Sequence, residues 1–162
     1  MEIRNLITQA QGNPNCIVYA AAGPPTTAPG SLPDDLSRFY AMCGGIDLHR
    51  SGDYPISIVG PSEFVRANPV IAGVEGEDDI SYNWYIIARN GMQFVTIDCD
   101  DSRLGKCYDS FWDQHAIRGS VPIIALSFTE LLKRLLSGGG RHWYWLQGGF
   151  PSYGDAYDSV KE

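Results

Sequence analysis

Residues Asn83–Tyr108 have the sequence NWYIIARNGMQFVTIDCDDSRLGKCY, which predicts three successive β-strands. Two apolar runs, Trp84–Arg89 and Phe94–Asp98, flank Asn90-Gly91, and this dipeptide favours a hairpin because both residues tolerate positive φ. A polar loop then leads into a shorter strand that starts at Lys106–Tyr108. Three strands with one apolar face are barely stable alone, so the rest of the chain must cover that face.

Two segments predict helices that can supply this cover. Leu32–Cys43 has Pro33 at a first-turn position and is followed by Gly44-Gly45, which we expect to form a left-handed stop. Ser127–Ser137 begins with an N-cap serine and has Glu130 three residues on, the pattern of a capping box.

The second of these helices has an apolar stripe that should face the sheet. Leu126 and Leu131 also occupy the two positions of a hydrophobic staple at its start. The stripe consists of Phe128, Leu131, Leu132, Leu135 and Leu136.

The remaining elements are shorter. Apolar residues at helical spacing predict a helix over Met1–Gln11, and helical turns over Pro61–Asn68 should stop before Pro69. Proline and glycine make Gly23–Ser31 an irregular loop. Pro122 places the strand that contains it at an edge of the sheet. The further expected strands are Cys16–Ala21, Ile46–Leu48, Pro55–Val59 and Val121–Leu126.

Length and composition indicate one domain over residues 1–162, with 44% hydrophobic residues to build a core. No apolar run approaches the ~20 residues of a membrane helix, and the N-terminal segment lacks the apolar core of a signal peptide. We therefore expect a cytoplasmic protein without a membrane partner. The four cysteines form no C-x-x-C pair, and we expect them to be reduced and partly buried.

The net charge of −7 limits the kinds of partner that we expect. Sequence-independent binding of nucleic acid needs clustered lysine and arginine, so we predict no nucleic-acid partner. An acidic chain can bind a basic protein, although acidity also serves solubility alone.

Motifs for catalysis or for a phosphate-bearing cofactor are absent from the sequence. The acidic run Asp98–Asp101 invites a calcium interpretation, but an EF-hand requires glycine and glutamate where Arg103 and Asp109 stand. A solvated hairpin loop is the simpler interpretation of this run. Cysteine and histidine also lack the spacing of zinc ligands. We predict no catalytic, cofactor-binding or metal-binding residues.

Two surface features suit the binding of another protein. One is the loop Ala72–Ser81, which concentrates carboxylates, and the other is the aromatic tail Arg141–Glu162. Acidic side chains can steer a basic partner, and tryptophan can anchor it. The alternatives are a loop that is merely solvated and a tail that packs on its own core. The candidate partner-binding residues are Glu75, Glu77, Asp78, Asp79, Trp143 and Trp145.

Four motifs in this order resemble the SUKH superfamily, the Smi/Knr-type proteins, over about Ser31–Leu136. The sequence departs from the family pattern at Cys43, where asparagine is frequent, and at Gly23–Gly30, which replaces a longer helix. The motifs are LPDDL at Leu32–Leu36 with Phe39-Tyr40 and Gly44-Gly45, WYIIA at Trp84–Ala88 before Asn90-Gly91, GKCY at Gly105–Tyr108, and SFTELL at Ser127–Leu132.

The resemblance implies an α+β fold, with a twisted, mostly antiparallel β-sheet covered by helices. Its core would span about residues 31–136, with an aromatic-rich C-terminal extension over 137–162. It also implies a non-enzymatic immunity protein that neutralises a cognate toxin, often a nuclease, by binding it. The alternatives are a regulatory or scaffold interaction domain of the same fold and, less favoured, a small enzyme with a scattered site.

Overall fold

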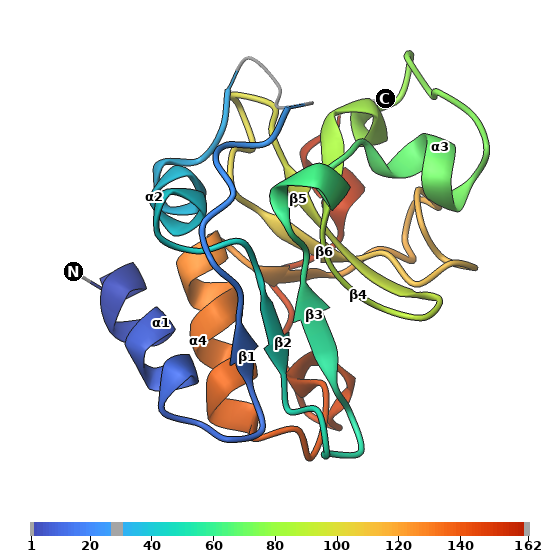
Figure 1. The fold of residues 1–162 in the computed structure, drawn as a ribbon. Helices are drawn as coiled ribbons and strands as arrows, with labels where there is room; N and C mark the ends of the chain where they lie inside the picture. The colour runs from blue at the N-terminus through green and yellow to red at the C-terminus, as the bar shows by residue number, and fades with distance from the viewer. Residues whose placement is uncertain (1, 27–30, 161–162) are drawn as a thin grey trace.

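The computed structural model describes residues 2–26 and 31–160, and it shows a seven-stranded sheet with helices packed against it (Figure 1). Each strand pairs in an antiparallel sense with the strand that follows it in the chain, which confirms the predicted α+β class. The strands are β1 Ile17–Val18, β2 Ile46–Leu48, β3 Ile56–Ile58, β4 Trp84–Asn90, β5 Gln93–Asp98, β6 Cys107–Asp109 and β7 Ile123–Ala125.

Four α-helices and four short 3-10 helices complete the described chain. No helix of the described ranges is long and apolar enough to cross a membrane. The α-helices are α1 Glu2–Gln11, α2 Asp34–Met42, α3 Ala67–Ile71 and α4 Phe128–Gly138. The 3-10 helices are η1 Pro61–Glu63, η2 Ile80–Asn83, η3 Tyr144–Leu146 and η4 Ala156–Ser159.

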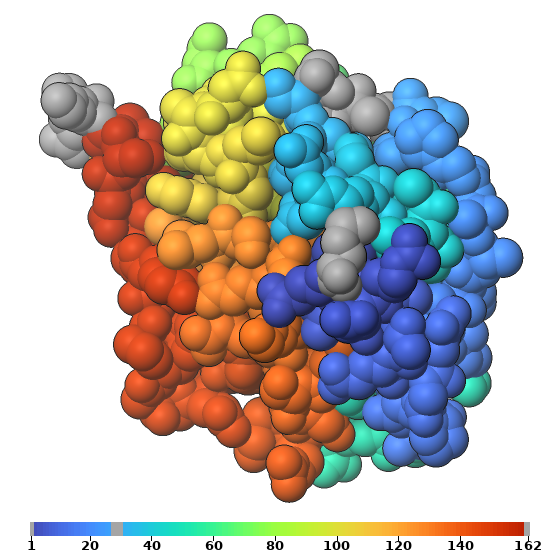
Figure 2. Space-filling view, turned by 90° about the vertical axis from the view of Figure 1, so that its left-hand side faces the viewer, coloured from blue at the N-terminus to red at the C-terminus, as the bar shows by residue number. Residues whose placement is uncertain are grey.

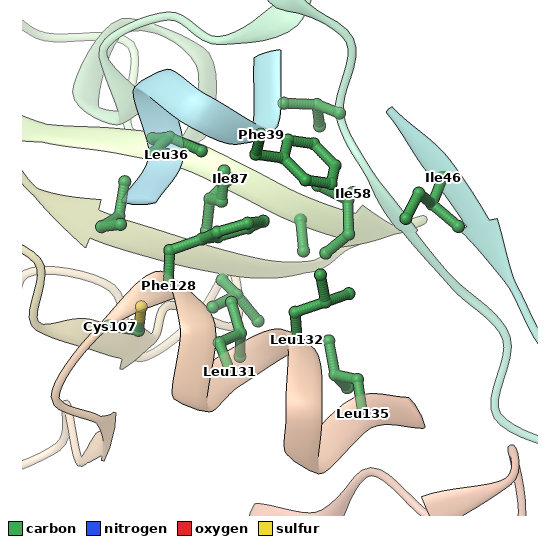
Figure 3. Packing of buried hydrophobic residues seen from close by; sticks show 14 of the residues in the cluster. Leu36, Phe39, Ile46, Ile58, Ile87, Cys107, Phe128, Leu131, Leu132 and Leu135 are labelled. Atoms are coloured by element: carbon green, nitrogen blue, oxygen red, sulfur yellow. The ribbon is translucent and has the colours of Figure 1, made fainter. Parts of the chain in front are cut away.

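Three of the helices, α1, α2 and α4, pack against one another and cover the main core (Figure 2). The apolar stripe of α4 points at the sheet and at α2, so that the rings of Phe128 and Phe39 meet edge to face at 4.8 Å between centroids (Figure 3). All five stripe residues of α4 are buried, as the sequence predicts. This layer supplies the cover that the central strands require.

A second, smaller apolar cluster lies on the other face of the sheet. Successive residues of a strand point to opposite faces, so Cys107 belongs to the main core while Tyr108 belongs to this second cluster. The C-terminal tail covers it through η4, and both faces of β5 are consequently buried. The second cluster consists of Trp84, Tyr108, Val121, Ile123, Ala156 and Tyr157.

The central hairpin is confirmed, but its turn is displaced by one residue from the predicted Asn90-Gly91. Asn90 pairs with Gln93, so the two turn residues are Gly91 and Met92. Gly91 has φ 57, which suits a turn with a left-handed first position. Asn90 instead donates its side-chain amide to the carbonyl of Pro55 at 2.6 Å, which ties the hairpin to β3.

The end of α2 differs from the expected left-handed stop at Gly44-Gly45. The helix ends through Cys43, which is extended at φ −152, and Pro33 is the N-cap residue that precedes the first turn. The glycines serve close packing instead, because a Cβ on Gly44 would lie 2.4 Å from the carbonyl oxygen of Ala20. A side chain at this position would push the start of the sheet apart.

The predicted stop before Pro69 is wrong. Pro61–Glu63 forms η1, and α3 then runs over Ala67–Ile71 with Pro69 as its third residue. Proline is tolerated there because the first N–H groups of a helix have no partner within the helix.

The start of α4 has the predicted cap with one change of partner. The Ser127 hydroxyl accepts the Glu130 backbone N–H at 3.0 Å, but the Glu130 carboxylate accepts the N–H of Leu126 rather than that of Ser127. Leu126 is 47% exposed, so the expected staple position is not buried. Gly139 ends the helix in the left-handed conformation at φ 64.

The other predicted strands are present: Ile46–Leu48 has the expected bounds, the remaining three are shorter than expected, and Cys16–Ala21 contributes only β1. β7 is an edge strand, as Pro122 predicts, and Pro122 forms a bridge with Asp155 of the tail. All four cysteines are free and buried. Residues 27–30 of the loop expected over Gly23–Ser31 lie outside the described residues.

Asp98 is not part of a solvated loop, which corrects the interpretation of the acidic run. Its side chain is fully buried and accepts four donors: the Trp84 indole N–H at 3.1 Å, the Tyr108 hydroxyl at 2.5 Å, Arg103 Nε at 3.0 Å and the Asp100 backbone N–H at 3.0 Å. Burial raises the pKa of Asp98, and these donors oppose that effect by stabilising the carboxylate. The aspartate therefore joins the second apolar cluster to the loop that follows β5.

Candidate protein-binding surface

The acidic loop between α3 and η2 presents its four carboxylates to solvent. Glu75, Glu77, Asp78 and Asp79 are all exposed, and the loop lies on the side of the molecule away from α1 and α4 (Figure 1). The charge that the sequence concentrates here therefore reaches the surface.

Two of these four carboxylates already have partners within the protein. Glu75 forms an ion pair with Arg66 at 3.3 Å. Asp79 accepts the Ser81 backbone N–H and the Tyr157 hydroxyl, and although burial raises its pKa, these hydrogen bonds bring the pKa below its ordinary value. Glu77 and Asp78 form no ion pair with any residue in the described ranges, so they are the carboxylates most available to a partner.

Buried polar side chains fix the base of the acidic loop. The Asn68 amide donates to the Glu75 carbonyl at 3.1 Å and to the Ser81 hydroxyl at 3.0 Å. Asn68 Oδ1 lies 2.7 Å from Nε2 of His115, which belongs to the loop after β6. The sequence gives no periodic signal for these residues, and only the tertiary fold brings them together.

His115 is held in its neutral form. Its Nε2 faces an acceptor and therefore carries the proton, while its buried Nδ1 has no hydrogen-bond partner among the described residues. Burial lowers the pKa of His115 to about 4, against an opposing contribution from Asp79. Protonation of Nδ1 would place a positive charge beneath the acidic loop, and the new N–H would have no direct hydrogen-bond acceptor among the described residues.

Acidification should therefore destabilise the protein through His115. The unfolded state takes up this proton near pH 6.5 and the folded state only near pH 4, so stability falls as the pH drops between these values. The wild-type protein should lose about 3 kcal/mol between pH 7 and pH 4 that His115→Gln does not lose. Urea melts of both proteins across this range measure the difference, and parallel pH profiles would contradict the assignment.

The aromatic candidates of the tail pack onto the protein itself. Trp145 is only 7% exposed and stacks on the half-buried Trp143, with 6.1 Å between ring centroids. Trp143 in turn meets the ring of Tyr54 edge to face. The tail reaches the acidic loop through a different residue, Tyr157, whose hydroxyl donates to Asp79 at 2.7 Å.

Of the three histidines and four cysteines, all except the exposed His142 are buried. Burial raises the pKa of Cys99 to about 12 and also raises the pKa of Cys43 and Cys107, so these thiols stay protonated at neutral pH. His49 Nε2 donates to the Leu135 carbonyl at 2.8 Å. Within residues 2–26 and 31–160, no three His, Cys, Asp or Glu side chains are grouped so as to hold a metal ion.

The fold and its surfaces define an α+β protein whose exposed features suit contact with another protein. No family model matches the chain. The chain is similar to "Immunity protein YokJ" of Bacillus subtilis (strain 168), with 47% identity over 163 residues that cover 99% of each protein. The chain belongs to the family of this immunity protein, which confirms the immunity-like class predicted from the motifs.

Proposed function

We propose that this protein is a non-enzymatic, cytoplasmic immunity protein of the SUKH type that neutralises one cognate toxin by binding it directly. The observation that carries the proposal is the full-length similarity to an immunity protein. We further propose that residues 1–162 act as a single domain, and that the toxin, a nuclease in the favoured form of the hypothesis, presents a basic surface. Neither nucleic acid nor a membrane is a partner in this proposal.

The structural roles of His49, His115 and the buried thiols support binding rather than catalysis. His49 and His115 are both buried and hydrogen-bonded to groups that hold the fold together. A general base must reach a substrate proton, and neither ring is placed at an open surface. Direct binding requires no such group.

The acidic loop is the proposed site of first encounter, with Glu77 and Asp78 as its freest charges. Exposed charges act over about 8 Å at physiological ionic strength, so added salt should weaken their influence on the rate of association. Trp143 and Trp145 are the competing anchors, and their burial favours a supporting role for the tail.

Neutralising Glu75, Glu77, Asp78 and Asp79 together should slow association with the toxin about tenfold at low salt and much less at high salt. The probe is the purified product of the reading frame next to this gene, measured by binding kinetics at two salt concentrations. Separate pairs, Glu77→Gln with Asp78→Asn and Glu75→Gln with Asp79→Asn, should show that the first pair has the larger effect.

A charge-matched control separates local steering from net charge. Asp34→Asn with Asp53→Asn removes two exposed charges from α2 and from the β2–β3 connection, and it should leave association almost unchanged. If the four-charge variant binds as fast as the wild type at both salt concentrations, the loop is only a solvated loop. If the wild type itself fails to bind and to protect cells, the proposed function is wrong.

A further inference from the structure

Several exposed apolar side chains belong to segments on the side of the molecule that bears the acidic loop (Figure 1). Among the described residues, ten large hydrophobic side chains are exposed, and five of them lie on α3 and its loop, on the tip of the β4–β5 hairpin and on the loop after β6. These segments project from the same side of the molecule (Figure 1). The five residues are Val70, Val74, Met92, Trp112 and Ile117.

Trp112 and Met92 are joined through their backbones. The Trp112 backbone N–H donates to the Met92 carbonyl at 3.2 Å, so the loop after β6 is fastened to the hairpin tip. Trp112 is 51% exposed and Met92 is 56% exposed. A tryptophan and a methionine that are both exposed on backbone-paired segments leave apolar area in water that a partner can bury.

The loop that bears Trp112 is held rigid from beneath. The buried Asp109 carboxylate accepts the Phe111 backbone N–H at 3.1 Å and the Gln93 amide at 2.8 Å. The Phe111 carbonyl then accepts the N–H of His115 at 3.0 Å. A preformed platform loses little conformational entropy on binding, which favours its use as an anchor.

The same loop contacts the base of the acidic loop. His115 lies three residues after Trp112 and meets Asn68, which holds the Glu75 carbonyl. Asp113, next to Trp112, is exposed and adds a further carboxylate to this side. The two nearby arginines are engaged, Arg66 with Glu75 and over the Tyr82 ring, and Arg118 over the Tyr157 ring.

We infer that the indole of Trp112, on the loop that is hydrogen-bonded to the hairpin tip at Met92, is the anchor of the toxin-binding surface and inserts into an apolar depression of a basic protein surface. This inference rests on the proposed function and names the contact within it. Hot spots are enriched in tryptophan at desolvated centres, and charges at the rim set the encounter rate. Trp112 therefore governs dissociation, while the acidic loop governs association.

The test measures binding of Trp112→Ala to the purified product of the neighbouring reading frame. The dissociation constant should rise at least about 30-fold, which corresponds to about 2 kcal/mol, and mainly through faster dissociation. Met92→Lys sets a positive charge against a basic partner and should weaken binding in the same direction. Tyr19→Ala is the matched control, because Tyr19 is an aromatic of 45% exposure near the β1 edge of the sheet, and it should leave the affinity unchanged.

Melting temperatures near that of the wild type show that each variant is folded, and Met92→Lys keeps the test decisive if Trp112→Ala unfolds. If the wild type binds tightly and both variants bind equally well, the inference is overturned while the proposed function stands. If the wild type instead self-associates through this surface and Trp112→Ala makes it monomeric without changing toxin binding, a second copy covers the patch, and the inference is again overturned.

Discussion

Replacing Asp98 by alanine should lower the free energy of unfolding by about 3–5 kcal/mol, because it leaves a largely buried cation and buried donors without an acceptor. Arg103 has a side chain only 13% exposed and pairs with Asp98 at 3.0 Å. The Trp84 indole and the Tyr108 hydroxyl point at the same carboxylate oxygen. Removing the aspartate thus strands three donor side chains that water cannot easily reach.

Urea melts measure this effect, and Asp100→Ala provides the control. Asp100 carries the same carboxylate two positions on, but its side chain is 32% exposed. Its partners include Ser102, which is exposed, and Arg103, which keeps its pairing with Asp98 in this variant. That variant should lose about 1 kcal/mol or less. Equal losses in the two variants would contradict the structural role of Asp98.

Truncating Leu132 to alanine should cost about 2–5 kcal/mol, because the site lies between α4 and the sheet and cannot collapse fully (Figure 3). Leu132 has no exposed surface, and Leu131 is equally buried beside it. A cavity left at this position would face the strands that the helix covers.

The N-cap variant Ser127→Ala provides the scale for comparison. It removes one hydrogen bond of 3.0 Å at the partly buried start of the same helix and should cost about 1 kcal/mol. Urea melts of the two variants should therefore separate clearly. Equal midpoints would show that α4 is not seated on the core as described.

The central hairpin and α4 could be predicted because their signals are local. Alternating apolar runs set the strands, and a serine cap with a leucine stripe set the helix. The turn was displaced because Asn90 has a tertiary partner, the Pro55 carbonyl, that no local pattern reveals. The glycines after α2 are likewise required by the backbone next to them, which is Ala20 for Gly44 and Ile58 for Gly45, rather than by the helix end.

The candidate surface was predictable only in part. Composition alone indicates the acidic loop, but the pairing of Glu75 with Arg66 and of Asp79 with Tyr157 depends on contacts across the fold. In the sequence, the aromatic pair Phe111-Trp112 within a polar segment was the one signal that the loop after β6 could bind a partner. The pair matters for binding because Trp112 is exposed, and a single sequence does not reveal that exposure.

The tail bridge at β7 also bears on how the protein avoids aggregation. An open strand edge offers unpaired N–H and C=O groups to any passing extended chain, and such edges seed intermolecular β-sheets. Here Ile123 exchanges hydrogen bonds with Gly154 and Tyr153, and Ala156 donates to Val121, so residues 153–156 occupy the places that an eighth strand would take. Pro122 has no N–H to offer. This edge is therefore closed to strand addition, and newly made chains can accumulate at high concentration without joining through it.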